Sequence, residues 1–192
     1  MIELKYPLIL ASNSPRRKEL LEKLELPFTI QTVAVDESIP SHVTPEEAAK
    51  YLAETKSTAH KHLADNAIVL TADTIVLLDN KILGKPSSHE EAYEMLGKLS
   101  GKTHKVITGV CIRLGSEIHS FDTTTEVTFE ALSPEEINFY VASGNADDKA
   151  GAYGIQDWIG LAGIKSIEGS YYNVVGLPVH EVYTHLKTYF KT

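Results

Sequence analysis

Two arginines stand at the predicted start of a helix in the N-terminal stretch LILASNSPRRKELLEKL. Ser14 is a good N-cap and Pro15 suits the first helical position, so the helix begins beside Arg16 and Arg17. A helix N-terminus already carries about half a positive charge, and further cations there are unfavourable. The stretch therefore predicts an anionic ligand held by backbone N–H groups and guanidinium groups, as in a phosphate site. A solvated basic turn is the alternative.

Two other stretches of the chain open a helix in the same way but with acidic residues. TPEEAAKYL begins at Thr44 and SPEEINFY begins at Ser133, and both have Glu-Glu where the first stretch has Arg-Arg. Glu47 and Glu136 occupy the third helical position, where a capping box and the helix dipole both favour glutamate. These two openings need no ligand, which sets the arginine pair apart.

Asp73 is a carboxylate in the middle of the apolar run AIVLTADTIVLLD. If it were buried without a partner it would cost several kcal/mol, so it must meet a metal ion, a cation or water. Beside phosphates, an aspartate can bind a divalent cation or accept a proton from an attacking water. The alternative is an aspartate at a strand end that bonds to neighbouring backbone.

Two lysines could supply positive charge near Asp73. Lys56 lies on the face of its predicted helix that otherwise points inward, and a snorkelling lysine is the alternative. Lys85 lies between Gly84 and Pro86, and the proline restricts it to an extended conformation. A solvated loop lysine would explain it equally well. Because phosphoryl transfer depends on positioned positive charge, both are candidates.

Glu37 and Gln156 are secondary candidates. Glu37 closes the predicted strand FTIQTVAVDES and could be a second carboxylate for a metal ion, or a solvated strand end. Gln156 follows two glycines in DDKAGAYGIQDWIG, and its amide has both a donor and an acceptor for a nucleobase edge. A tight surface loop is the alternative for this stretch.

The composition limits the classes of function. The chain has 192 residues, is 43% hydrophobic and has a formal net charge of -8. That charge argues against broad binding to nucleic acid and favours a small anionic ligand. Neither a secretory signal nor an apolar run of about 18 residues is visible, so no membrane association and a cytoplasmic location are expected. Cys111 is the single cysteine, which excludes an intrachain disulfide.

The elements that would position these residues alternate between strands and helices. The pattern predicts an α/β protein with a mixed sheet, because alternating units and a long antiparallel hairpin occur together. Strands are expected at residues 7–11, 28–35 and 67–79, and a hairpin at 104–114 and 118–132. Helices are expected at 15–24 and 45–63, from Ser88 to Gly101, from Pro134, and at the C-terminus.

Five blocks, in order and spacing, resemble the Maf family of septum formation Maf-like proteins, over about residues 8–180: ASNSPRR, TADTIVLLDNKILGKP, LSGKTHKVITGV, DKAGAYGIQ and GSYYNVVGLP. The resemblance implies one Maf-like domain over residues 1–192 and a nucleoside triphosphate pyrophosphatase that needs a divalent metal, Mg²⁺ or Mn²⁺. It implies an elongated mixed sheet flanked by helices, with two lobes around a deep cleft, as in inosine triphosphate pyrophosphatases. A homodimer is common in such proteins.

The resemblance also assigns roles. The proton acceptor falls on Asp73, and Glu37 matches an acidic position near the metal. Phosphate-binding positions fall on Ser12, Arg17, Lys56 and Lys85. Positions that distinguish branches with different nucleobases fall on Arg16, Thr74 and Gln156, and these residues look like the dTTP/UTP branch, with modified pyrimidine nucleotides left open. The stretch QDWIGLAGIKSIEG departs from many relatives. The rival readings are a nucleotide-sensing protein that acts in cell division through a partner, and a housekeeping enzyme for noncanonical nucleotides.

Overall fold

Seven strands form one mixed sheet within residues 2–191, the residues that the computed structural model describes. The strand order is β2-β1-β3-β5-β6-β7, with β4 paired to β3. β1 pairs in parallel with β2 and β3, whereas the β3–β4 and β6–β7 pairs are antiparallel. The strands are β1 Leu8–Leu10, β2 Phe28–Ile30, β3 Ile68–Leu78, β4 Lys81–Leu83, β5 Thr103–Leu114, β6 Glu117–Phe129 and β7 Ile164–Glu168. The predicted α/β class with a mixed sheet is confirmed.

The chain divides into two compact units. Unit 1 comprises the residues up to Asp73, Thr108–Thr123 and the residues from Gly176 onward, and unit 2 comprises Thr74–Ile107 and Thr124–Val175. The boundary in β3 falls directly after Asp73. The single domain over residues 1–192 and the cleft between two lobes stay predictions.

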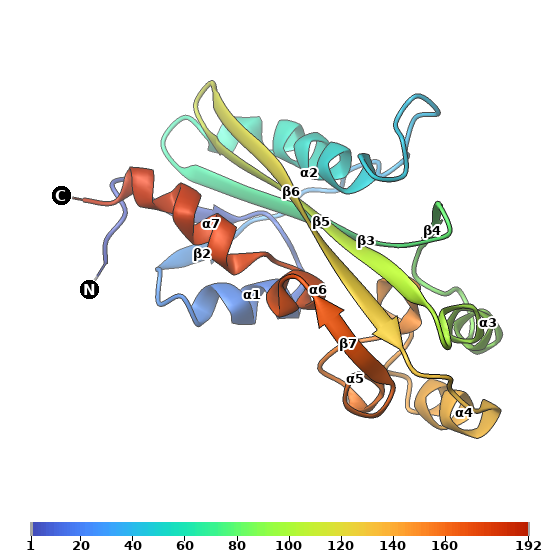
Figure 1. Cartoon of the computed structure of the whole chain (residues 1–192). Helices are drawn as coiled ribbons and strands as arrows, with labels where there is room; N and C mark the ends of the chain where they lie inside the picture. Colours follow the sequence, from blue (N-terminus) through green and yellow to red (C-terminus); the bar gives the residue numbers. More distant parts are fainter. Residues whose placement is uncertain (1, 192) are drawn as a thin grey trace. The chain divides into compact units, whose positions relative to one another are not determined.

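Each unit has its own helices. Unit 1 has α1 Pro15–Glu22, α2 Ala48–Ala59 and α7 Val179–Leu186, and short 3-10 helices at Lys61–Leu63 and Lys187–Tyr189. Unit 2 has α3 His89–Leu99, α4 Pro134–Ala142, α5 Trp158–Ala162 and α6 Tyr171–Val175, and a 3-10 turn at Ala150–Ala152. Within unit 2, α3 and α4 lie side by side and contact one another (Figure 1). None of the helices in residues 2–191 is long and apolar enough to cross a membrane.

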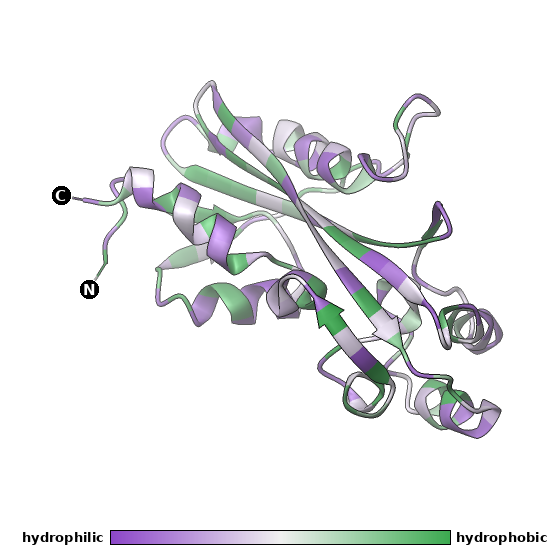
Figure 2. Ribbon diagram, viewed as in Figure 1, coloured by the Kyte–Doolittle hydropathy of each residue, from purple (hydrophilic) through white to green (hydrophobic). Residues whose placement is uncertain are grey.

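The cores form where apolar strands meet the helices of their own unit. β3 is buried along nearly all its length, and its apolar residues stand out in the hydropathy colouring (Figure 2). In unit 1, Leu10, Leu21 and Leu70 are fully buried. In unit 2, Leu96 of α3 and Tyr140 of α4 belong to one hydrophobic cluster. Both ends of the strand that carries Asp73 are therefore anchored in packed apolar surroundings.

Local signals in the sequence set several boundaries as predicted. Ser14 caps α1 by accepting from the N–H of Arg17 at 3.5 Å, with Pro15 in the first turn. Ser133 and Glu136 form the full capping box of α4. The turn between β3 and β4 has Asp79 and Asn80 with φ of 49° and 61°, the left-handed conformation that these residues tolerate.

The lengths of two elements and one capping box were predicted wrongly. The strand expected over 28–35 ends at Ile30, because β1 offers partners only for Phe28 to Ile30. The helix expected over 45–63 is α helix only over Ala48–Ala59. Its predicted capping box does not form: Glu47 Oε2 accepts from the N–H of Thr44 at 3.1 Å and from its hydroxyl at 2.7 Å, so that hydroxyl is a donor rather than the cap of the first turn.

Candidate functional site

In the loop before α1, two serine hydroxyls accept hydrogen bonds from nearby backbone N–H groups. Ser12 is 9% exposed, and its Oγ accepts from the N–H of Ser14 at 3.3 Å. Ser14 in turn caps the helix, so the two serines define the path of the chain into the first turn of α1. This turn has no acidic residue, and Arg16 and Arg17 are half-buried in it. The helix start is therefore electropositive and structured, as an anion site requires.

Arg17 joins three segments of unit 1. Its Nε donates to the carbonyl of Gly176 at 2.9 Å, and its Nη1 donates to the carbonyl of Ala72 at 2.8 Å and to Ser12 Oγ at 3.2 Å. Burial lowers the pKa of Arg17, and the charge of Asp73 opposes that effect. From the sequence, Arg17 was expected only to bind an anion. The structure shows that it also fixes Ser12 and the strand residue before Asp73.

Lys56 and two carboxylates meet in unit 1. The Nζ of Lys56 lies 2.5 Å from Asp73 Oδ1 and 3.1 Å from Glu37 Oε1. The side chains of Lys56 and Asp73 are 15% and 13% exposed, whereas that of Glu37 is 56% exposed. The snorkelling alternative for Lys56 is thus wrong, since its ammonium is engaged by two carboxylates. Asp73 meets a cation, which is one of the three kinds of partner predicted for it.

A buried histidine supports this cluster and was missed in the sequence analysis. His60 follows α2, and its Nδ1 lies 2.7 Å from the carbonyl of Lys56 while its Nε2 accepts from the N–H of Val33 at 3.1 Å. The ring is 2% exposed. Because Nε2 is the acceptor, Nδ1 carries the proton. His60 therefore ties the end of the helix that carries Lys56 to the segment that leads to Glu37, a contact that no local sequence pattern indicates.

The remaining candidates lie in unit 2. Thr74 follows Asp73 in β3 and is half-buried, so its side chain points to the opposite face of the strand. Lys85 is exposed in the loop after β4. The carbonyl of Gly84 accepts from the N–H of Gly151 at 2.9 Å, which joins the Lys85 loop to the segment that leads to Gln156. Gln156 is exposed, directly after the buried Ile155.

The protein contribution to a metal site would be small. Within residues 2–191, no group of three or more His, Cys, Asp or Glu side chains could hold a metal ion on its own. Asp73 and Glu37 offer two carboxylates around the Lys56 ammonium. Mg²⁺ commonly takes one or two carboxylates and completes its shell with substrate phosphates and water. The donor set fits a metal that arrives with a phosphate ligand.

The comparisons with known proteins assign the class. A family model described as Maf-like protein matches residues 7–189, and the chain belongs to the Maf family. This is the family that the sequence motifs resembled. A solved structure, the Ham1 protein of Staphylococcus aureus, matches 64% of this chain and 71% of its own at 15% identity, with a TM-score of 0.45.

Curated relatives are similar over nearly their whole length. A protein of Phocaeicola vulgatus is 49% identical over 185 residues, which cover 95% of this chain and 96% of the relative. One from Bacteroides thetaiotaomicron is 48% identical with the same coverage. One from Porphyromonas gingivalis is 47% identical over 189 residues, with 96% of this chain and 95% of the relative covered. Each of the three is named dTTP/UTP pyrophosphatase.

Proposed function

We propose that this protein hydrolyses dTTP and UTP to the nucleoside monophosphate and pyrophosphate. Relatives that share nearly half of its residues over about the full chain carry the name of this activity. The observation on which the proposal depends is the cluster of Lys56, Asp73 and Glu37 in unit 1. It combines a carboxylate for proton transfer with a cation for phosphate charge, and the electropositive start of α1 belongs to the same unit.

In this mechanism Asp73 orients a water molecule and accepts its proton as the water attacks the α-phosphorus. The bond from the α-phosphorus to the bridging oxygen breaks, and pyrophosphate leaves with the bond's electron pair. Lys56 balances the negative charge that develops on the phosphate oxygens as pyrophosphate leaves. Because Lys56 is held by two carboxylates, its position is set before the substrate arrives.

The start of α1 binds the phosphate chain in this proposal. Its N–H groups and dipole attract the anion, and Ser12 contributes a hydroxyl. Arg17 supplies positive charge and, through its bonds to Ser12 Oγ and the Ala72 carbonyl, sets the distance between the phosphate site and Asp73. Lys85 is a further phosphate ligand by resemblance to the family. A divalent cation, Mg²⁺ or Mn²⁺, would be held by Asp73 and Glu37 and would neutralise phosphate charge when bound.

Base selectivity is assigned to Arg16, Thr74 and Gln156. The amide of Gln156 can donate and accept at once, which suits the adjacent carbonyl and N–H of a thymine or uracil edge. Its exposure leaves the side chain available for such a contact. The proposal includes a cytoplasmic location, because that compartment holds the nucleotide pool. A homodimer stays a prediction, to be tested by sedimentation.

Product analysis tests the reaction. Purified protein is incubated with Mg²⁺ and, separately, dTTP, UTP, CTP, GTP, 7-methyl-GTP or ITP, and pyrophosphate is measured apart from orthophosphate. Pyrophosphate with dTMP or UMP is the expected result. Release from another base alone would overturn the selectivity assignments. Tight dTTP binding without any product would favour the nucleotide-sensing alternative.

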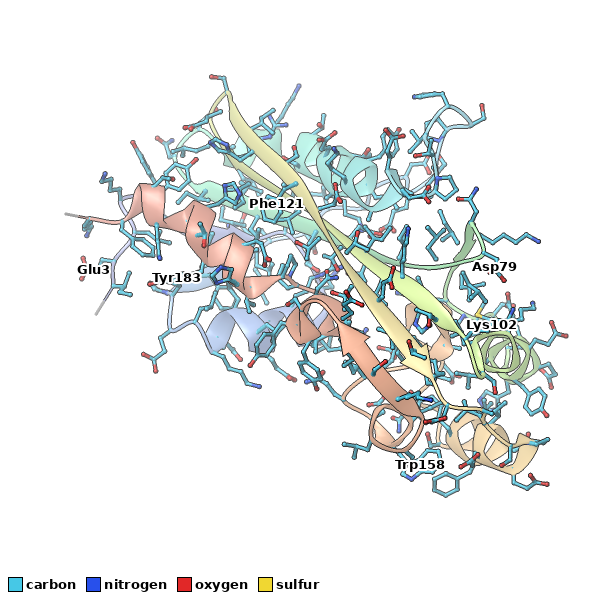
Figure 3. The ribbon with its side chains drawn as sticks, viewed as in Figure 1. Glu3, Asp79, Lys102, Phe121, Trp158 and Tyr183 are labelled. Atoms are coloured by element: carbon cyan, nitrogen blue, oxygen red, sulfur yellow. The ribbon has the colours of Figure 1, made fainter. Side chains whose placement is uncertain are left out.

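Replacement of Asp73 tests the catalytic assignment. Asp73→Asn removes the proton acceptor but keeps the size of the side chain, so turnover should fall by about 10²-fold or more while dTTP binding persists. Asp79→Asn is the matched control, because Asp79 is an exposed aspartate directly after the same strand and forms a surface ion pair with Lys102 at 3.3 Å (Figure 3). Full activity of the Asp73→Asn protein would refute the assignment.

A further inference from the structure

The loop that carries Gln156 is fastened by a buried tyrosine hydroxyl. The hydroxyl of Tyr140 in α4 donates to Asp157 Oδ2 at 2.7 Å and accepts from the N–H of Gly154 at 3.1 Å. Burial and the carboxylate of Asp157 both raise the pKa of Tyr140, so the phenol keeps its proton and remains a donor. One hydroxyl therefore holds the residue two before Gln156 and the residue directly after it.

The carboxylate of Asp157 bonds to this hydroxyl, although Asp157 stands where it could cap a helix. It occupies the N-cap position of α5, where aspartate ordinarily accepts from N–H groups of the first turn. Its side chain makes no such bond. Instead Asp157 Oδ2 meets Tyr140 and lies 3.4 Å from the Nζ of Lys149, whose side chain is 12% exposed. The carboxylate therefore holds the loop to Tyr140 and does not cap α5.

The loop and the helix that follows it leave no room for a side chain at two glycines. A Cβ on Gly154 would lie 2.3 Å from Asp157 Oδ2, and a Cβ on Gly160 would lie 1.9 Å from the carbonyl oxygen of Ile155. The loop is thus packed against the Asp157 carboxylate on one side and against α5 on the other. Between these contacts Gln156 is exposed, and Trp158, the residue after Asp157, is at the surface of unit 2 (Figure 3).

We propose that Tyr140 and Asp157 are positioning residues that set base selectivity by fixing the Gly154–Asp157 loop and so the direction of the Gln156 amide. The inference rests on the proposed function, because it needs Gln156 to contact the base. A flexible Gln156 amide would bind several bases weakly, whereas an amide held in one direction favours the hydrogen-bonding edge of one base. Neither residue touches the reacting phosphates in this scheme, so they act on base recognition and not on the chemical step.

The test compares kcat and KM for dTTP and GTP in the wild type, Tyr140→Phe, Asp157→Asn, Gln156→Ala and the Tyr140→Phe/Gln156→Ala double variant. Tyr140→Phe should raise KM for dTTP about tenfold, change kcat less than about twofold and reduce the preference for dTTP over GTP. In the Gln156→Ala background the same change should have little further effect, because the amide that it positions is gone. Tyr153→Phe is the matched control, since Tyr153 is a buried tyrosine of the same unit whose hydroxyl bonds to His104.

The outcomes separate the two proposals. A wild type that releases no pyrophosphate from dTTP overturns the proposed function and, with it, the inference. A selective wild type whose Gln156→Ala or Tyr140→Phe variant keeps the wild-type preference overturns the inference alone. Tyr140→Phe could instead lower kcat/KM equally for dTTP and GTP, and do so to the same extent in the Gln156→Ala background. That result would show a merely structural role for Tyr140 and would also overturn the inference. If Asp157→Asn fails to fold, Tyr140→Phe carries the test.

Discussion

His104 should make the stability of the protein fall in mild acid. The ring is 2% exposed, stacks on Phe129 with centroids 5.5 Å apart, and places Nε2 2.7 Å from the hydroxyl of Tyr153. Its Nδ1 has no hydrogen-bond partner within residues 2–191. A second ring proton would therefore be buried without an acceptor. Burial accordingly lowers the pKa of His104 from its ordinary value of 6.5 to about 4.

The sign and size of the effect follow from linkage. Between these two values the unfolded chain binds a proton at His104 that the folded chain does not, so the contribution of His104 to the free energy of unfolding is fully present above pH 6.5 and is lost as the pH drops toward 4. At about 1.36 kcal/mol for each pH unit, the whole interval corresponds to about 3 kcal/mol, of which about 2.5 kcal/mol is lost by about pH 4.5.

Urea unfolding at about pH 7.5 and about pH 4.5 measures this loss. His104→Gln keeps an amide near the Tyr153 hydroxyl but cannot titrate, so its free energy of unfolding should fall by about 2.5 kcal/mol less than that of the wild type over this interval. His119→Gln is the control, because it replaces an exposed histidine and leaves His104 in place. Equal pH dependence in the wild type and His104→Gln would refute the reasoning.

Two further changes test the framework of unit 1. Gly109→Ala should destabilise the protein by about 1–3 kcal/mol and lower kcat/KM for dTTP, because its Cβ would lie 2.3 Å from the backbone of Ala49 in the helix that carries Lys56. Gly97→Ala is the control, because Gly97 lies within α3 and a Cβ there would meet no neighbouring atom; it should stabilise the protein by about 0.5–1 kcal/mol. Thermal melts of the two glycine variants measure the difference. Arg17→Lys should lower the melting temperature and kcat/KM together, since one ammonium cannot reproduce the three bonds of the guanidinium; an unchanged melting temperature would contradict its role as a brace.

Local signals predicted much of the fold because they act over a few residues. Ser14 and Ser133 mark helix starts through their own side-chain bonds, and Asp79-Asn80 marks a hairpin through its tolerance of positive φ. The end of β2 at Ile30 was not predictable in this way. It depends on the length of β1, which is distant in sequence.

In the candidate site, too, some features follow from residue types and others from the packing of distant segments. Residue types alone required Asp73 to meet a metal ion, a cation or water, because an isolated carboxylate in an apolar strand is too costly, and made the start of α1 electropositive. The packing of distant segments makes Lys56 the partner of Asp73, places Glu37 beside the same ammonium, and lets Arg17 brace Ser12 and Ala72. The same holds for the anchoring of the Gln156 loop by Tyr140. Side-chain chemistry is a property of each residue, whereas the choice among partners depends on which segments the packed sheet and helices bring within hydrogen-bond distance.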